Sequence, residues 1–472
     1  MPLRECAPRF VSRRPMILFR LLARALGASC VLVPMCCVGN AFSAGISSGP
    51  MAGYSGRDRA DIWLMTDGDA RIAIDFWPAR QAQGTSRPEV VETSAAGGHA
   101  AVVRLDGLRP GTRYRYRVRI DGRDALPGVP LGFVTQPAVA RAPRDVSLAT
   151  GSCAYLADES DRAGSESATA FGIFDVIAAR RPDVMLWLGD TVYFRDADFD
   201  GGSVANVPAR MNGRWASTRT YAPLQRLLRT GQHYGIWDDH EFGPNDADGS
   251  FVLKPMSNYL FRRYWANGRY GLPGVPGIFS KVSYEDVDLF LLDDRTHRDD
   301  DDLPDDMPGK SMLGAAQLAW LKDELARSRA TFKLIANGSR MLSDRPNAER
   351  RGGEGWHNHP AERRAFIDWL TANRIDGVVF VSGDIHYTHM TERERADSYP
   401  LVELTCSPLT SNVHPRPNPV RPVEGTVALE RNFCTMDFRG APDARELVIA
   451  VWRADGSRLW QRRYAASALR SR

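Results

Sequence analysis

Short apolar runs recur along the chain, and each one ends abruptly at a glycine or a polar residue. The run at residues 184–188 has five apolar residues and stops at Gly189-Asp190. An unbroken apolar run of this length is typical of a strand that is buried on both faces, as in a parallel sheet covered by helices. Four further strand-like runs, which include some polar residues, also end at a glycine or a polar residue; they lie at residues 147–150, 232–237, 332–336 and 377–382. We expect these runs to form buried strands.

Helical patterns alternate with these runs. They span residues 168–181, 315–330 and 361–373. Strands that alternate with helices predict an α/β core. Near the C-terminus, the apolar segments 445–452 and 457–460 flank an Asp-Gly pair, which predicts a β-hairpin that closes the sheet.

Residues 61–137 have a different pattern, in which short strands are separated by turns. The expected strands lie at residues 61–65, 70–76, 102–105 and 114–120. The last of these alternates arginine with apolar or aromatic residues, which predicts one solvated and one buried face. Tyr114 follows a Leu-Arg-Pro-Gly segment, as in β-sandwich corners where a tyrosine hydroxyl caps the bend. We predict a small all-β sandwich of fibronectin or immunoglobulin type at residues 45–140, and a larger α/β domain at residues 141–472.

The first 44 residues differ in composition from the rest. Arginines come first, and residues 25–56 then carry no charge. Small residues around Ala44 suit a signal-peptide cleavage site. Ser12-Arg13-Arg14 resembles a twin-arginine export signal, whereas a start at Met16 would leave a shorter secretory signal. The alternative is a retained membrane anchor, because the uncharged stretch is long enough to cross a bilayer. We predict an exported protein, periplasmic or secreted, with no membrane span after cleavage.

Composition and cysteine usage narrow the functional class. The net charge of +4 is small and the two signs are interspersed, so we expect no nucleic-acid-binding surface. Four of the seven cysteines lie in the leader, which leaves Cys153, Cys406 and Cys434. Export would permit a disulfide between Cys406 and Cys434, but two buried free thiols fit the sequence equally well.

The loops after the five apolar runs carry side chains that bind metals. A thiol, a phenol, imidazoles, carboxylates and an amide occur there, and together they suit one soft and one hard cation. They are Cys153, Asp190, Tyr193, Asp239, His240, Asn337, Asp384 and His386. Because ligands gather where the strands of an α/β sheet end, we interpret these loops as one two-metal site.

Four of these loops resemble the motifs of the PhoD-type alkaline phosphatases, within the metallophosphatase superfamily. The motifs are Gly151-Ser152-Cys153, Gly189-Asp190-Thr191-Val192-Tyr193, Trp237-Asp238-Asp239-His240-Glu241 and Gly383-Asp384-Ile385-His386. The resemblance extends over about residues 50–455. It implies a four-layer α/β/β/α sandwich preceded by the small β-sandwich.

The resemblance also implies a set of metal ligands. Cys153, Asp190, Tyr193 and His386 would hold Fe³⁺, and Asp190 would bridge to Ca²⁺ or another divalent metal. Asp239, Asn337 and Asp384 would complete that second site. Thiolate and phenolate bound to iron(III) would also make the protein coloured.

Several other polar residues are candidates for catalysis or for binding the substrate. His240 is the candidate for protonating the leaving oxygen, and Arg295 for clamping the phosphate, unless it pairs with a neighbouring aspartate. Arg298 and Arg340 are weaker substrate-binding candidates. His357 and His359 are expected at the surface or at the rim of the site, and His389 in a solvated loop.

The resemblance implies an exported, metal-dependent phosphoesterase of alkaline-phosphatase type. It would hydrolyse phosphate monoesters, diesters or both, by in-line attack of a metal-bound water or oxide on a small phosphate-ester substrate. A phosphodiesterase or phospholipase D-type enzyme could use the same site. The alternative from another class is a non-catalytic surface binding protein with a structural metal site. The sequence does not indicate an oligomeric state.

Overall fold

The computed structural model describes residues 44–81, 88–138, 142–156, 172–200, 204–344, 353–414 and 421–471. The predicted leader falls almost entirely outside the described residues, as does the middle of the segment that joins the two predicted domains. No helix in the described ranges has both the length and the apolarity needed to cross a membrane.

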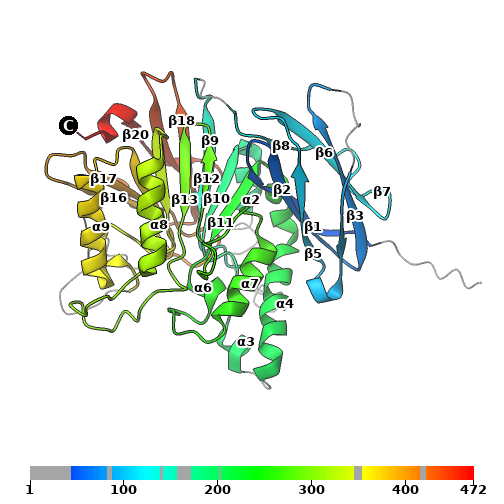
Figure 1. Ribbon diagram of the computed structural model, residues 1–472, viewed down its shortest axis with the longest axis horizontal. Helices are drawn as coiled ribbons and strands as arrows, with labels where there is room; N and C mark the ends of the chain where they lie inside the picture. Colours follow the sequence, from blue (N-terminus) through cyan, green and yellow to red (C-terminus); the bar gives the residue numbers. More distant parts are fainter. Residues whose placement is uncertain are drawn as a thin grey trace, which may run out of the picture. The chain divides into compact units, whose positions relative to one another are not determined.

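Nine strands of the described chain form one mixed sheet (Figure 1). Their order is β20 (Arg458–Ala465), β19 (Glu446–Arg453), β18 (Asn432–Arg439), β9 (Val146–Gly151), β10 (Val184–Leu188), β11 (Gln232–Ile236), β1 (Ile46–Ser55), β2 (Arg59–Thr66) and β5 (Ala100–Asp106). The central strands β9, β10, β11 and β1 are parallel neighbours. Three predicted apolar runs are therefore confirmed as the buried middle of this sheet, and the predicted C-terminal hairpin is confirmed as β19 and β20.

A second sheet contains six strands of the described chain. Their order is β12 (Ser280–Tyr284), β13 (Val287–Leu291), β14 (Phe332–Ala336), β15 (Val378–Ser382), β17 (Leu401–Thr405) and β16 (His389–Arg393). The strands β13, β14, β15 and β17 are parallel. The two sheets pack on each other: the rings of Phe332 and Phe438 lie 5.1 Å apart, and a disulfide joins Cys406 to Cys434. The other two predicted runs are confirmed as β14 and β15.

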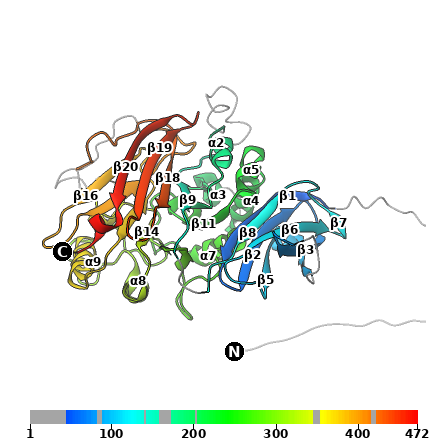
Figure 2. The same cartoon turned by 90° about the horizontal axis from the view of Figure 1, so that it is seen from above.

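Helices cover the outer faces of the two sheets. Figure 2 shows α2 (Gly172–Arg180) and α5 (Gln225–Leu228) on one side, and α8 (Gly314–Arg327) and α9 (Pro360–Ala372) on the opposite side. Figure 1 shows α3 (Asp196–Asp200), α4 (Val207–Arg219), α6 (Asp239–Phe242) and α7 (Lys254–Tyr264) grouped together. The three predicted helices correspond to α2, α8 and α9, although residues 168–171 lie outside the described part. The fold is α/β, with two sheets between layers of helices.

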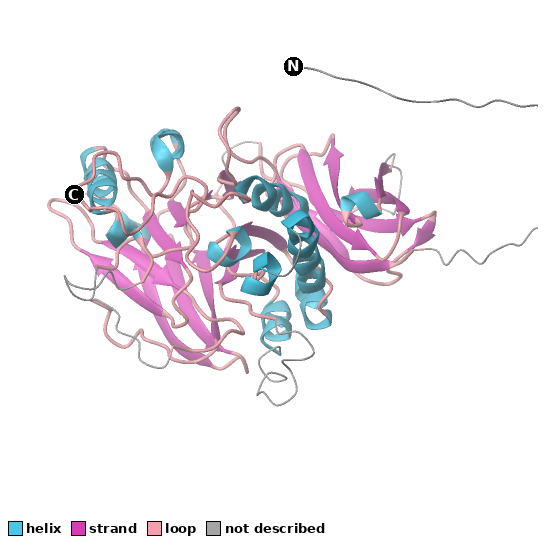
Figure 3. Cartoon of the chain, turned by 90° about the horizontal axis from the view of Figure 1, so that it is seen from below, coloured by secondary structure: helices cyan, strands magenta, loops and turns pink. Residues whose placement is uncertain are grey.

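The N-terminal part of the described chain is formed almost entirely of strands (Figure 3). The strands β4 (Glu89–Thr93), β3 (Ala70–Pro78), β6 (Arg113–Ile120) and β7 (Arg123–Asp124) form a further sheet, and β8 (Leu131–Val134) pairs with β6. The alternation in β6 buries its aromatic and aliphatic residues and exposes arginines. The Tyr114 hydroxyl accepts a hydrogen bond from the backbone N–H of Arg109 at 2.8 Å, so the predicted capped corner is confirmed.

The strand β2 belongs to two hydrophobic cores at once. Ile62 and Leu64 face the core of the β-sandwich, whereas Trp63 and Met65 face the core of the α/β part. Successive side chains of a strand point to opposite faces, so one strand serves both sides. The Trp63 indole also donates to the Arg263 carbonyl at the end of α7, at 2.9 Å. The sandwich is thus joined to the α/β part by a continuous sheet, and the boundary near residue 140 stays a prediction.

The buried parallel strands should dominate stability. Leu186 lies in the middle of β10, is fully buried and has a strand on each side. We expect Leu186→Ala to lower the free energy of unfolding by about 2–5 kcal/mol, because it removes a buried side chain and leaves a cavity. The matched variant Val252→Ala, at a residue that is 84% exposed, should change stability by less than about 0.5 kcal/mol. Urea unfolding followed by circular dichroism would test this, and equal losses for the two variants would contradict it.

Candidate metal centre

The carboxyl ends of the parallel strands in both sheets meet at one place. Ala154, after β9, donates its backbone N–H to the carbonyl of Asp190, after β10, at 2.8 Å. In the second sheet, Gly383 after β15 donates to the carbonyl of Gly338 after β14 at 2.9 Å. Gly189 permits the close approach of two loops, because a Cβ on it would lie 2.7 Å from the Cβ of Asp238. The predicted site loops therefore lie side by side.

Four predicted ligands converge on the loop after β10. The Cys153 sulfur lies 3.4 Å from Asp190 Oδ2, and the Tyr193 hydroxyl lies 3.3 Å from the same oxygen. Ligand atoms of Cys153, Asp190 and His386 all fall within 4.8 Å of one another. The Cys153 thiol is free and buried. A thiol, a phenol, an imidazole and a carboxylate thus surround one point.

A second group of possible metal ligands also includes Asp190. Ligand atoms of Asp190, Asp239 and His240 fall within 4.8 Å of one another. The Asn337 side chain is buried and donates from Nδ2 to the Ser339 carbonyl, which leaves its Oδ1 with no partner among the described residues. Asp190 Oδ1 is likewise buried and unpartnered there. Buried oxygens are normally satisfied, so this group suits a hard cation with oxygen ligands.

Four of these residues have an unusual backbone conformation. The φ angle is +56° at Cys153, +56° at Asp190, +72° at Asp384 and +59° at His386. Residues other than glycine rarely adopt positive φ, and such strain persists only where the surrounding structure enforces it. The backbone is therefore held in a strained conformation at four predicted metal ligands.

Glu241 enforces part of this arrangement. Its buried carboxylate accepts the backbone N–H of Asp190 at 2.8 Å and of Asp238 at 3.1 Å, and it also accepts the backbone N–H and the hydroxyl of Thr191. One side chain thus connects the loops after β10 and β11. Our sequence analysis missed this role. The signal was the Asp238-x-x-Glu241 pair, which forms a capping box at the start of α6.

Burial and neighbouring acids raise the pKa values of three of the predicted ligands. Burial, followed by the charge of Asp239, holds the pKa of Asp190 well above its ordinary value. Burial, Glu354 and Asp239 raise the pKa of Asp384 to about 8. Burial and the charge of Asp190 also raise the pKa of the Cys153 thiol. A bound cation would reverse these effects and displace protons, so metal binding should release protons.

The contacts of the Arg295 side chain do not fit our prediction that it clamps a phosphate. Its guanidinium is fully buried. It is bonded to Asp238 through Nε at 2.9 Å, to both Glu354 oxygens at 2.6 and 2.7 Å, and to the Ala247 carbonyl at 3.1 Å. These acceptors engage the donors that would hold a phosphate. The alternative, pairing with a nearby aspartate, describes Arg295 better.

The two weaker arginine candidates differ from each other. Arg298 is buried and pairs with Asp301 at 2.7 Å and with Glu354 at 3.0 Å. Arg340 is mostly buried, and in the described part of the chain its guanidinium has no ion pair within 4.0 Å. Its charge acts on Asp384, where it lowers the carboxyl pKa. Of the three arginine candidates, Arg340 is therefore the one whose guanidinium is not engaged by a carboxylate among the described residues.

Three histidines lie in more buried positions than predicted. His357 and His359 are buried rather than at the surface, and each bonds through Nε2 to a backbone carbonyl at 3.2 Å. His389 was expected in a solvated loop, but it begins β16 and is completely buried. The sequence around a histidine does not show whether its side chain is buried. These three are covered by strands and loops that are distant in the sequence.

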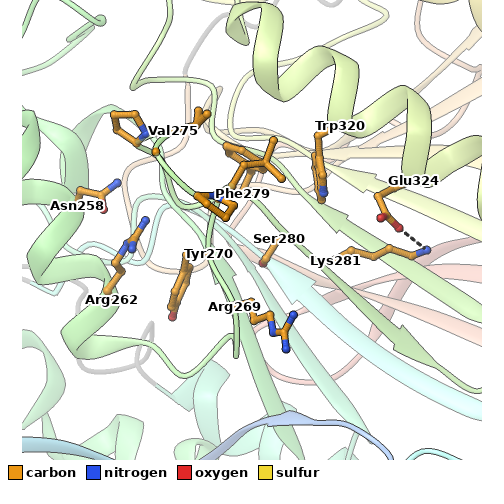
Figure 4. A pocket seen from close by; sticks show the side chains of 15 residues that line it. Asn258, Arg262, Arg269, Tyr270, Val275, Phe279, Ser280, Lys281, Trp320 and Glu324 are labelled. Atoms are coloured by element: carbon orange, nitrogen blue, oxygen red, sulfur yellow. Dashed lines mark hydrogen bonds and ion pairs between the residues drawn. The ribbon is translucent and has the colours of Figure 1, made fainter.

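A separate cavity lies away from this site. It has a volume of about 1010 Å³ and lies beside the segment that precedes β12, with residues such as Arg262, Tyr270, Phe279, Lys281 and Trp320 along its wall (Figure 4). None of the predicted ligands lines it. The metal-ligand geometry, rather than cavity size, therefore marks the candidate site.

Comparisons with known proteins relate part of this chain to a family of phosphatases. Residues 274–444 match the family of PhoD-like phosphatases. The alkaline phosphatase D of Bacillus subtilis (strain 168) is 23% identical over 326 residues, which cover 61% of this chain. Residues 274–444 therefore form a PhoD-like phosphatase domain. The match covers 53% of the Bacillus protein, so the chain corresponds to about half the length of this relative.

Solved structures support the fold of this PhoD-like chain. The structure of PhoD aligns with a TM-score of 0.71 at 16% identity, over 90% of this chain and 93% of that one. A purple acid phosphatase from yellow lupin (Lupinus luteus) seeds aligns with a TM-score of 0.58 at 11% identity, over 88% of this chain and 74% of that one. Residues 43–136 match a domain of unknown function, DUF7800. The metallophosphatase fold implied by the resemblance is thereby confirmed.

Glu241 should control metal binding through the loops that it connects. We expect Glu241→Gln to lower metal affinity by about 10–100-fold, because an amide cannot accept all these hydrogen bonds. The control Glu362→Gln changes a carboxylate with similar chemistry, which accepts the backbone N–H groups of Met312 and Leu313 at 3.2 Å. Calorimetric titration with metal should show loss only in Glu241→Gln. Equal affinities in the two variants would argue against this role.

His389 should make the protein sensitive to acid. Burial, assisted by the charge of Arg340, lowers its pKa to about 3. Protonation therefore favours the unfolded state, in which histidine titrates near 6.5. The stability that the neutral ring contributes is present above about pH 6.5 and is lost toward pH 3, at up to about 1.4 kcal/mol per pH unit. In urea unfolding between pH 7 and 4.5, His389→Phe should lose less stability than the wild type, whereas parallel losses would contradict the assignment.

Proposed function

We propose that this protein is an exported phosphoesterase that hydrolyses phosphate monoesters, diesters or both at a two-metal site. The observation that carries the proposal is the convergence of a thiol, a phenol, an imidazole and a shared carboxylate from separate strands, at Cys153, Tyr193, His386 and Asp190. The match of residues 274–444 to the PhoD-like phosphatases supports phosphate esters as the substrate class.

The donor sets fit two different cations. Cys153, Tyr193 and His386, with Asp190, would hold Fe³⁺, since soft and aromatic donors suit a transition metal. The unpartnered oxygens of Asp190 and Asn337, with Asp239 and Asp384, would hold Ca²⁺ or another divalent ion. When bound, the cations would neutralise the phosphate and lower the pKa of a water molecule for in-line attack.

His240 is the residue that we assign to the leaving group. Its ring lies 4.3 Å from the ring of Tyr193, and its backbone N–H donates to Asp239 Oδ1 at 2.8 Å. Its buried Nδ1 makes no hydrogen bond among the described residues. An imidazole held in this way can donate a proton to the departing ester oxygen.

Arg340 is the residue that we assign to the phosphate. Its guanidinium makes no ion pair with the residues that the structure describes, and its charge acts on Asp384, which belongs to the predicted second metal site. A guanidinium presents a planar fork of donors that matches two phosphate oxygens. Arg295 would act indirectly, because its charge offsets the carboxylates of Asp238 and Glu354 behind the site.

Export is part of the proposal. The Cys406–Cys434 disulfide supports it, since disulfides persist in oxidising compartments such as the periplasm or the extracellular space. The predicted signal lies outside the described residues.

Turnover of two chromogenic esters would test the proposal. We expect hydrolysis of p-nitrophenyl phosphate, of bis-p-nitrophenyl phosphate or of both, with loss of activity in chelator and recovery on metal addition. Asp190→Asn should lower kcat by about 100-fold or more, because the carboxylate that both metals share is removed. The control Asp175→Asn, in an exposed pair with Arg226, should keep full activity.

The outcomes separate the candidate functions. Relative rates on the two esters decide between monoesterase and diesterase. A folded, metal-loaded wild type with no turnover of either ester would favour a binding protein with a structural metal site and would overturn the proposal.

A further inference from the structure

One serine hydroxyl lies between two of the predicted iron ligands. Ser407 Oγ donates to the sulfur of Cys153 at 3.1 Å and accepts the backbone N–H of His386 at 3.1 Å. The hydroxyl has a single hydrogen, and the structure directs it at the sulfur. Ser407 follows β17 and was not among the residues singled out from the sequence as chemically active.

The surrounding structure holds Ser407 rigidly. The residue is completely buried, its N–H donates to the Thr388 hydroxyl at 3.0 Å, and its carbonyl accepts from Asn432 Nδ2 at 3.1 Å. The preceding residue, Cys406, is joined by a disulfide to Cys434 in the opposite sheet. The hydroxyl therefore has little freedom to leave the sulfur.

The same segment supports the loop of Cys153 from the other side. The carbonyl of Cys406 accepts the backbone N–H of Ser152 at 3.1 Å and its hydroxyl at 3.0 Å. The neighbouring backbone at Cys153 has a φ angle of +56°. Residues 406 and 407 thus brace the strained ligand loop and point one donor at its sulfur.

We propose that Ser407 is a positioning residue for the Cys153 thiolate, and that its hydrogen bond sets the electronic state of the metal bound there. This inference rests on the proposed metal site. A hydrogen bond to a metal-bound thiolate lowers the energy of the sulfur electrons and weakens their donation to the metal. Removal of the donor should make the sulfur a stronger electron donor and the ligand less well fixed.

A matched set of variants separates this role from a purely structural one. Ser407→Ala removes the donor, and Ser407→Thr keeps a hydroxyl. The control is Ser382→Ala, because Ser382 is also completely buried, at the end of the neighbouring strand β15, and pairs with the Thr405 hydroxyl at 2.9 Å. Ser382→Ala removes the same hydroxyl oxygen, at a side chain that bonds to Thr405 and not to the Cys153 thiol.

The readouts are the thiolate-to-iron absorption band of the purified protein and the rate of iron release to a chelator. In Ser407→Ala we expect the band to move to lower energy, the reduction potential to fall, and iron affinity to drop by about 10–100-fold. Ser407→Thr should restore the wild-type band. Ser382→Ala should keep both the band and the release rate of the wild type.

Two results would overturn the inference, and they differ in scope. A folded Ser407→Ala variant with the wild-type band and the wild-type iron release would refute the role of Ser407 alone. A wild type that shows no thiolate-to-metal band after reconstitution with Fe³⁺ or Co²⁺ would remove the metal assignment of Cys153 and this inference together.

Discussion

The repulsion between buried carboxylates where the two sheets meet is the constraint on which the rest of the structure depends. Burial and neighbouring acids raise the pKa values of Asp190 and Asp384, so the charged forms of these two carboxyl groups are unfavourable in their surroundings. At the back of the site, Arg295 supplies the compensating charge between Asp238 and Glu354. At the front, unpartnered oxygens remain, and a bound cation is the natural compensation there. Repulsion between these buried carboxylates, which would destabilise an apolar core, therefore favours the binding of a cation.

Backbone strain is the second consequence of bringing these loops together. Four predicted ligands have positive φ angles, and each costs about 1–3 kcal/mol that the surrounding structure must offset. Buried hydrogen bonds provide this support, from the Glu241 carboxylate on one sheet and from the Cys406–Ser407 segment on the other. The supporting side chains are thus as specific to the site as the ligands themselves. Both sheets are needed, because neither contains the full set of ligands or of supports.

The described architecture also relates the β-sandwich to the site. The strand β2 contributes to both cores, and β1 pairs in parallel with β11, whose following loop carries Asp239. The N-terminal strands therefore flank a strand that leads to a predicted ligand, although the sandwich itself carries none of the predicted site residues. Its arginine-bearing face is partly neutralised, since Asp75 pairs with Arg117 and Arg119 at 2.8 Å.

Local patterns in the sequence determined the buried strands, the helices and the capped corner at Tyr114, and they singled out the loops that carry the predicted ligands. Their signals lie in short stretches: unbroken apolar runs, helical spacing, and metal-binding side chains directly after strands. The tertiary structure alone decided the partners of Arg295, the burial of His389, and the use of Glu241 and Ser407 as supports. It also decided between a disulfide and two free thiols at Cys406 and Cys434. These features depend on contacts between residues far apart in the chain, up to 254 positions for Ser407 and Cys153, and a polar side chain carries no local sign of the partner that will satisfy it.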